Sequence, residues 1–196
     1  DNKWITKDNI PKLTIKNKGK QTRRRGAFTP DEFNSLMEFL INWPAKTKIK
    51  MSMYKRELLH HYVIFLVRTG IRPGLESLRL RWSDFEFVKT PDGKSDYYRI
   101  QVRHGEKHAD EEEAHRSIVV TQEAYDDVAE GLKYCRLVYG GKEPEEDDLV
   151  FSYLDGSPLD TSGLSEMFGK VLDLCGLRKG NDGRSRSLYS CRHTYA

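Results

Sequence analysis

The chain has 196 residues, of which 37% are hydrophobic and 32% charged, so it can bury a core and is too apolar for a disordered protein. Its apolar runs fall short of the roughly 20 residues that cross a bilayer, and no signal-peptide pattern opens it, so neither a membrane protein nor a secreted one is indicated. The cysteines Cys135, Cys175 and Cys191 are odd in number and lack metal-ligand spacing. We therefore expect no disulfides and no metal site, and a cytoplasmic location.

The net charge of +3 is distributed unevenly along the chain. Residues 1–25 hold nine Lys or Arg against two Asp, and a second basic stretch near the other end contains Arg184 and Arg186. The segments 109–114 and 143–148 are acidic. Such segregation is typical of a protein with one face toward a polyanion, although charge runs also occur on solvated surfaces.

The first predicted helix follows a basic arm, residues 1–27. Thr29 is placed as N-cap, Pro30 stands at the first helical position, and Glu32 completes a capping box, with Phe28 and Phe33 spaced to staple the helix start. A stripe at helical spacing then predicts one buried face. It consists of Phe33, Leu36, Met37, Leu40 and Ile41.

The middle of the chain predicts a helix and a small sheet. A helix is expected from about Met53 to Thr69, with Gly70 as its left-handed end, followed by a short helix that passes into a strand by residue 87. The β-prone runs 96–103 and 116–120 bracket a charged loop and predict a hairpin.

Helical patterns return in the last third. Thr121 is placed as the N-cap of a helix, an apolar stripe over 164–175 stops at Gly176, and a last helix begins near Ser187. The fold class is therefore mainly α, of the α+β kind, with a small antiparallel sheet, in a single domain over 28–196.

Arg72 is the first residue that indicates chemistry. It stands at a helix junction with Glu76 four residues on, so its guanidinium has either a structural ion pair or a rigid position from which to bind a phosphate. Lys107 lies in the hairpin loop, where a lysine is either solvated or placed to protonate a leaving oxygen.

The last helix holds the other candidates. Tyr189 and Arg192 are three residues apart and so share one face, which suits a site as well as a surface or core polar pair. His193 lacks neighbours with metal-ligand spacing, so we interpret it as a hydrogen-bonded core histidine rather than a ligand.

The order of these pieces resembles the tyrosine recombinases, the phage-integrase family of site-specific DNA recombinases. The resemblance covers about 28–196 and is carried by "TGIRPGLESLRLRW" (69–82), the hairpin lysine and "LYSCRHTYA" (188–196). Two departures stand out. Glu76 lies four residues after Arg72 where many members have three, and Tyr189 occupies the position of the family's usual histidine.

The resemblance implies DNA strand breakage and rejoining through a 3′-phosphotyrosyl intermediate, without metal or cofactor. Arg72 and Arg192 would stabilise the phosphate charge and Lys107 would be the general acid, with Arg103 and His108 as neighbouring alternatives. Tyr189 would orient or relay a proton, and Glu76 and His193 would support the site. The nucleophilic tyrosine and a further His or Trp are expected after Ala196, so the chain alone should be inactive.

The same resemblance implies duplex DNA as partner, a homotetramer on DNA for the full-length protein, and a bacterial or phage origin. The arm 1–27 would be a linker from an amino-terminal DNA-binding domain. The expected DNA contacts are Arg23, Arg24, Arg25, Arg184 and Arg186. Two other classes stay open from the residues alone, a DNA-binding regulator without catalysis and a helical protein-interaction domain.

Overall fold

A computed structural model of the chain describes residues 25–91, 93, 96–103 and 116–194. Lys107, His108, Arg23 and Arg24 lie outside these residues. The helices are α1 (Pro30–Asn42), α2 (Lys50–Thr69), α3 (Leu75–Leu78), α4 (Gln122–Val138), α5 (Thr161–Leu174) and α6 (Leu188–Thr194), and the strands are β1 (Phe85–Val88), β2 (Tyr97–Val102) and β3 (Arg116–Thr121).

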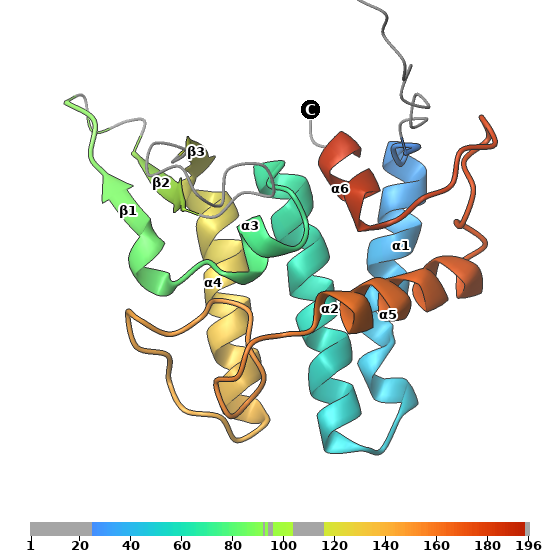
Figure 1. Ribbon diagram of the computed structural model, residues 1–196, viewed down its shortest axis with the longest axis horizontal. Helices are drawn as coiled ribbons and strands as arrows, with labels where there is room; N and C mark the ends of the chain where they lie inside the picture. The colour runs from blue at the N-terminus through green and yellow to red at the C-terminus, as the bar shows by residue number, and fades with distance from the viewer. Residues whose placement is uncertain (1–24, 92, 94–95, 104–115, 195–196) are drawn as a thin grey trace, which may run out of the picture.

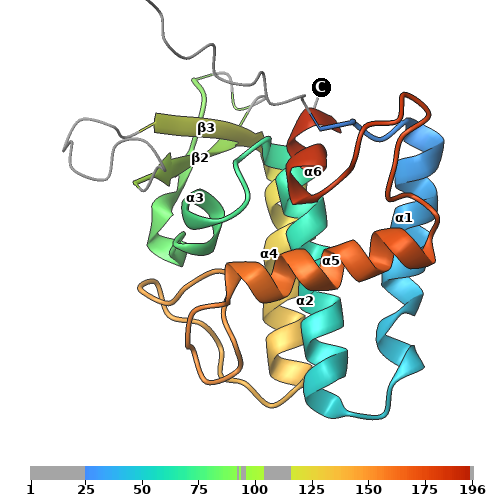
Figure 2. The same cartoon turned by 45° about the vertical axis from the view of Figure 1, so that its right-hand side comes forward.

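Helix α2 is the centre of the domain. It runs between α1 and α4, while α5 crosses in front of it and α6 packs against its upper end (Figures 1 and 2). The strands form one antiparallel sheet in the order β1-β2-β3 beside α4. The predicted mainly α fold with a small antiparallel sheet is confirmed.

The core lies where α2 meets these neighbours. The ring of Tyr62 on α2 meets that of Phe151 edge-on at 5.0 Å, and Phe151 also contacts Phe65. Among the described residues no helix is long and apolar enough to span a bilayer. The largest fully buried side chains are Tyr62, Phe151, Phe168, Leu36, Leu40, Leu58, Leu59, Leu66, Ile71, Leu80, Ile100 and Leu172.

The helix boundaries follow the predicted caps. Thr29 forms a complete capping box with Glu32, and Thr121 caps α4 by accepting a hydrogen bond from Ala124 N. Helix α2 begins at Lys50, three residues before the predicted start. Ile41, which the stripe places on the buried face of α1, is wrongly predicted, because it lies at the end of that helix with 61% of its surface exposed.

Candidate active site

The segment that carries Arg72 is fixed by the end of α2. Gly70 closes the helix in the left-handed region, with φ of 61°, which a residue without Cβ adopts at little cost. The buried Thr69 hydroxyl donates to the Phe65 carbonyl at 2.7 Å and accepts from Ile71 N at 3.2 Å. The chain therefore leaves α2 in one defined direction.

A second anchor lies just after Arg72. Gly74 has φ of 99° and ψ of −137°, a conformation open only to glycine, and its N–H donates to the Tyr62 hydroxyl at 3.2 Å. That hydroxyl also lies 2.8 Å from Ser77 Oγ. Burial raises the pKa of Tyr62 to about 12, so it remains a neutral phenol that holds the loop against α2.

Glu76 binds two arginines from different parts of the chain. Its carboxylate is 2% exposed; Oε1 accepts from Arg72 Nη1 at 2.5 Å, and Oε2 accepts from Arg116 Nη2. The Arg72 backbone N–H adds a third donor at 3.3 Å. Burial alone would raise the pKa of Glu76, but the hydrogen bonds from Arg116 and Arg72 outweigh it and hold the pKa below its ordinary value.

Arg192 reaches the same place from α6. Its Nη1 donates to the Gly70 carbonyl at 2.8 Å, although the two residues are 122 positions apart. Burial lowers the pKa of Arg192, and the positive charges of Arg72 and Arg116 lower it further. A guanidinium nevertheless stays protonated in proteins. Three guanidiniums and one carboxylate thus lie within electrostatic reach of one another.

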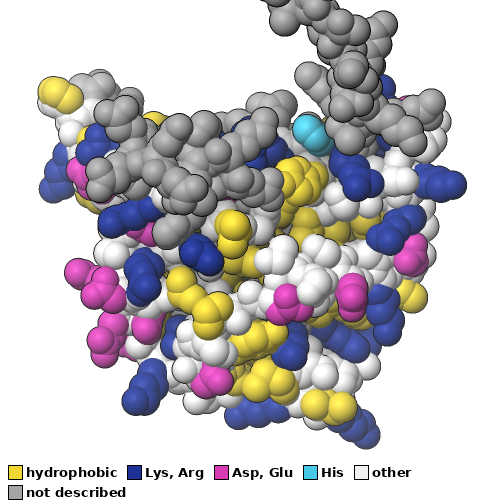
Figure 3. All heavy atoms as spheres, viewed as in Figure 1, with side chains coloured by type: hydrophobic (Ala, Val, Ile, Leu, Met, Phe, Trp, Pro, Cys, Tyr) yellow, Lys and Arg dark blue, Asp and Glu magenta, His cyan; other side chains and the backbone are white. Residues whose placement is uncertain are grey.

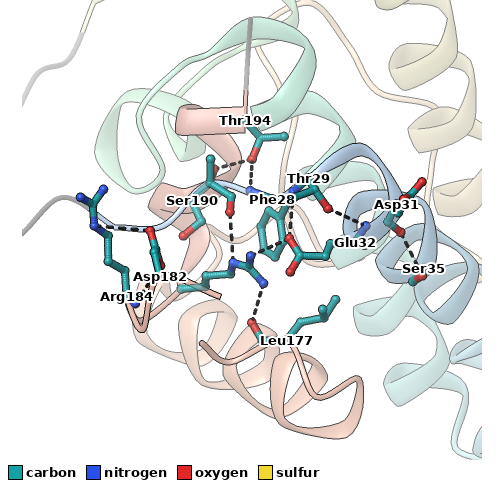
Figure 4. A network of polar contacts seen from close by, with 12 residues as sticks. Phe28, Thr29, Asp31, Glu32, Ser35, Leu177, Asp182, Arg184, Ser190 and Thr194 are labelled. Carbon is teal, nitrogen blue, oxygen red and sulfur yellow. Dashed lines mark hydrogen bonds and ion pairs between the residues drawn. The ribbon is translucent and has the colours of Figure 1, made fainter. Parts of the chain in front are cut away.

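Helix α6 is held in place from its other end. The Thr194 hydroxyl donates to the Ser190 carbonyl at 2.8 Å and accepts from the Phe28 N–H at 3.0 Å (Figure 4). The start of α1 and the end of α6 are therefore tied together. Since Arg192 lies within the same helix, this contact helps to fix its position.

Tyr189 lies beside the Arg72 loop. It is half-buried and lines a cavity of about 180 Å³ together with Pro73, Gly74 and Ser165. Its position on α6 is one turn before Arg192. His193 is exposed, so its interpretation as a core histidine is wrong: its neighbour Cys191 turns inward and is fully buried, while His193 faces away from the core.

The described structure is similar to several solved structures. XerH site-specific recombinase in a pre-cleavage complex with its difH substrate matches with a TM-score of 0.58 and 20% identity, over 88% of this chain and 42% of that chain. A lambda integrase dimer bound to a COC′ core site matches with a TM-score of 0.54 and 19% identity, over 91% and 54%. The lambda integrase catalytic core matches with a TM-score of 0.53 and 19% identity, over 87% and 80%.

The chain has the fold of a tyrosine recombinase catalytic domain. It spans about two fifths of the length of XerH and about four fifths of the lambda integrase catalytic core. No protein-family model and no curated protein sequence matches the chain. At these identities the likeness shows the tyrosine recombinase fold alone.

The tyrosine recombinase fold brings Arg72 and Glu76 close to Tyr189 and Arg192, although more than 110 residues of sequence separate the two pairs. The ion pair between Arg72 and Glu76 is present, so the structural interpretation of Arg72 is correct as far as it goes. The ion pair with Glu76 leaves 42% of the Arg72 side chain exposed, so a ligand can still reach the guanidinium.

Arg103, the cation that directly follows β2, pairs with a buried acid. Arg103, weighed as an alternative to Lys107, has its Nε 2.6 Å from Oδ1 of the buried Asp84. Asp84 Oδ2 in turn accepts from Arg81 N at 2.8 Å. Arg103 therefore links β2 to the segment before β1. A guanidinium stays protonated in proteins, so Arg103 is a poorer proton donor than a lysine.

The predicted DNA contact of Arg186 needs correction. Its side chain is 3% exposed, and Nη2 donates to Glu32 Oε2 at 2.6 Å while Nε donates to the Ala27 carbonyl at 3.1 Å. The guanidinium also lies 4.8 Å from the centre of the Phe28 ring. An arginine bound inside the domain on all these sides cannot meet a phosphate, so we remove Arg186 from the DNA contacts.

The remaining basic residues near α6 are on the surface. Lys and Arg side chains gather at the upper right of the face in Figure 3, over the connection between α5 and α6. Arg184 is exposed there and its Nε lies 3.4 Å from Asp182 Oδ2. Arg25 is also exposed. These two arginines remain candidates for contact with DNA.

Sequence reasoning missed two residues of the site. Tyr62 reads as one more apolar position of α2, and only the turn at Gly74 reveals the use of its hydroxyl. Arg116 follows the acidic loop as the first residue of the β-prone run 116–120, where one more charge attracts no notice. Its place at the start of a predicted strand was the one available signal.

Proposed function

We propose that this chain is the catalytic-domain part of a site-specific DNA recombinase or integrase that breaks and rejoins DNA through a 3′-phosphotyrosyl intermediate. The observation that carries the proposal is the convergence of Arg72 and Arg192 at the Gly70 turn, from segments 120 residues apart. Neither a DNA-binding regulator nor a protein-interaction domain needs two arginines from distant segments at one point.

The charge of the cluster favours an anion. Among the described residues of this cluster, Arg72, Arg116 and Arg192 contribute three positive charges and Glu76 one negative charge, which gives 3 − 1 = +2. A phosphodiester carries one negative charge, and more charge collects on its non-bridging oxygens during in-line displacement. Preorganised guanidiniums stabilise that charge and do at this site what metal ions do in other phosphoryl transfers.

The proposed reaction exchanges one phosphate ester for another. The hydroxyl oxygen of the nucleophilic tyrosine attacks phosphorus while its proton passes by way of Tyr189 to solvent, the bond between phosphorus and the 5′-oxygen breaks, and Lys107 supplies a proton to that oxygen. A 5′-hydroxyl from a second strand then reverses the step, with no net hydrolysis. Tyr189 would orient or relay the proton at the position of the family's histidine, with His193 beside Arg192.

Duplex DNA is the proposed partner, and a homotetramer is the proposed assembly of the full-length protein. Arg23, Arg24, Arg25 and Arg184 would contact the phosphate backbone. Residues 1–27 would form a linker, whose last residues already pack on the domain, because Gly26 N donates to the Ser185 carbonyl at 3.4 Å. Phosphate contacts of this kind position the protein without reading the base sequence.

The proposal is tested with the full-length protein on a nicked duplex of its own recombination site. We expect a protein–DNA adduct that survives denaturation, which Arg72→Ala and Arg192→Ala remove and Arg99→Ala keeps. Arg99 is a suitable control because it forms an exposed ion pair with Glu86 on the same sheet. DNA binding without any adduct would favour the regulator instead.

The role of Lys107 has its own test. An alkoxide is a poor leaving group at neutral pH, so a positioned acid contributes on the order of 10² to 10⁴ in rate, whereas a thiolate leaves without a proton. Sulfur in place of the bridging 5′-oxygen should therefore largely rescue Lys107→Ala and leave Arg72→Ala and Arg192→Ala impaired. A Lys107→Ala variant equally impaired on both substrates would show that another group is the acid.

A further inference from the structure

The base of the β2–β3 hairpin is attached at two points to the segment that follows Arg72, residues 73–84. Val102, the last residue of β2, pairs with Arg116, the first residue of β3. Arg103, next after β2, forms an ion pair with the buried carboxylate of Asp84, and Arg116 donates a hydrogen bond to the buried carboxylate of Glu76. Both acids belong to the segment of α3 and the turn before β1, so two strand ends are held by two buried acids.

The two fastenings differ in what they touch. Asp84 bonds Arg103 and the backbone of Arg81, so this pair joins the sheet to a structural turn. Glu76 bonds Arg116 with one oxygen and Arg72 with the other, so this pair joins β3 to an arginine that we place in the active site. Arg72 and Arg116 together determine the orientation of the Glu76 carboxylate.

The geometry points to Arg116 as a positioning residue that holds Arg72 through Glu76, an inference that rests on the proposed function for Arg72. A buried carboxylate with both oxygens bonded has one orientation. When Arg116 is removed, Glu76 Oε2 keeps, among the described residues, only the 3.3 Å bond from the Arg72 backbone N–H, so the carboxylate can rotate and the direction of the Arg72 guanidinium changes with it. Arg116 itself needs no contact with DNA for this effect.

The charge of Arg116 also limits how Glu76 acts on Arg72. Glu76 alone with Arg72 would form a neutral pair with little attraction for a phosphate. Because Arg116 takes one carboxylate oxygen, the group of three has a charge of 2 − 1 = +1 before Arg192 is added. Arg116 therefore lets Arg72 be held by an acid without losing the positive charge that the reaction needs.

The first test measures the link without any cleavage. In wild-type protein the Arg72 guanidinium should show slow exchange of its Nη1 protons by NMR, because Nη1 donates to Glu76 Oε1. Arg116→Ala should speed this exchange several-fold while backbone signals of α2 and α5 stay unchanged. Arg116→Lys should keep part of the slow exchange, since an ammonium can still donate one hydrogen bond to Glu76.

Arg99→Ala is the matched control, since it removes an arginine of the same sheet whose acid, Glu86, lies outside the site. It should leave the Arg72 exchange as in wild type. An Arg116→Ala protein in which the Arg72 exchange is also unchanged would overturn the inference, because Glu76 would then hold Arg72 alone.

The second test uses single-turnover cleavage by the full-length protein. Arg116→Ala should lower the rate by on the order of 10²-fold, the cost of misplacing a group by about an ångström, with DNA affinity within about twofold of wild type. If Arg116 acts through Glu76, the double variant Arg116→Ala/Glu76→Gln is no slower than Glu76→Gln alone. Multiplying losses, or a loss found only in affinity, would mean that Arg116 binds DNA directly.

The two tests separate the two claims. A full-length wild-type protein that cleaves no site would contradict the proposed function, and the Arg72 exchange would then decide the link by itself. Cleavage by wild type together with undiminished cleavage by Arg116→Ala would contradict the positioning role and leave the proposed function standing.

Discussion

Two arginine–glutamate clusters in this domain consist of the same residue types but differ in exposure and in charge balance. At the start of α1, Glu32 binds one arginine, Arg186, whose side chain is 3% exposed. At the end of α2, Glu76 binds Arg72 and Arg116, whose side chains are 42% and 39% exposed. The first cluster is balanced and closed, whereas the second has surplus positive charge and faces solvent.

The difference shows which property marks a functional arginine. Both Arg186 and Arg192 come from one basic stretch, and both bind backbone carbonyls. Arg186 has a carboxylate of its own and lies over the Phe28 ring, so its charge is used inside the domain. Arg192 lies near two further guanidiniums, those of Arg72 and Arg116, and near the Glu76 carboxylate that both of them bind. Unbalanced charge at an exposed point, rather than basic sequence, distinguishes the site.

The largest effect on folding should come from the closed cluster. Arg186→Ala removes the partner of Glu32 and leaves a space over Phe28, which should lower the free energy of unfolding by about 3 kcal/mol or more. Urea unfolding of the 196-residue chain measures it. Arg184→Ala, two residues away and exposed, should unfold at the same urea concentration as wild type. Equal stability of the two variants would show that the Glu32–Arg186 pair does not hold α1 to the α5–α6 connection.

The open cluster should respond most strongly to loss of its acid. Glu76→Gln removes the carboxylate that Arg72 and Arg116 share and should lower the free energy of unfolding by about 2 kcal/mol. Arg72→Ala should cost less, because Glu76 keeps its bond to Arg116. The same urea measurement checks the order. A greater loss for Arg72→Ala than for Glu76→Gln would contradict the surplus of positive charge.

Acid should weaken both clusters over the same pH range. The pKa values of Glu32 and Glu76 are both held below the ordinary value of 4.5, since their hydrogen bonds outweigh burial. A carboxyl with a lowered folded-state pKa stabilises the fold above its unfolded pKa and loses this contribution as pH falls below it. The stability difference between wild type and Glu32→Gln, or Glu76→Gln, should therefore shrink below about pH 4.5. A difference that stays constant on acidification would show that neither pKa is lowered.

DNA affinity should show the smallest differences. The chain should bind duplex DNA weakly and with a steep salt dependence, and each phosphate contact contributes about one to the slope of log K against log salt. Arg184→Gln should lower that slope by about one, whereas Glu32→Gln, at the closed cluster, should leave it unchanged. Binding titrations at several salt concentrations decide it. An affinity indifferent to salt would exclude the electrostatic basis of binding.

Local signals predicted the elements well because they depend on nearest neighbours. The capping box at Thr29, the left-handed Gly70 and the cap at Thr121 all form as the sequence indicates. Arg72 and Arg192 could be identified because each lies in a segment, 69–82 or 188–196, that resembles a tyrosine recombinase motif. Their meeting at the Gly70 carbonyl depends on how α6 packs against α2, which no local pattern encodes.

The errors have the same origin. Arg186 was predicted to face DNA because basic residues surround it in sequence, but its partners Glu32 and Ala27 lie at the other end of the chain. Arg116 was overlooked because its acid, Glu76, is 40 residues away. Charge pairing across long separations is a property of the packed domain, so it becomes visible only when the helices are placed together.

The most direct test of the surplus charge replaces one non-bridging oxygen of the scissile phosphate by a methyl group, which makes the phosphate neutral. On ordinary DNA, Arg72→Ala and Arg192→Ala in the full-length protein should each lower the single-turnover cleavage rate by on the order of 10² to 10³. On the neutral substrate the same changes should cost less than about tenfold, because less charge needs stabilising. Equal losses on both substrates would contradict the account, since the two arginines would then act on something other than the charge of the phosphate.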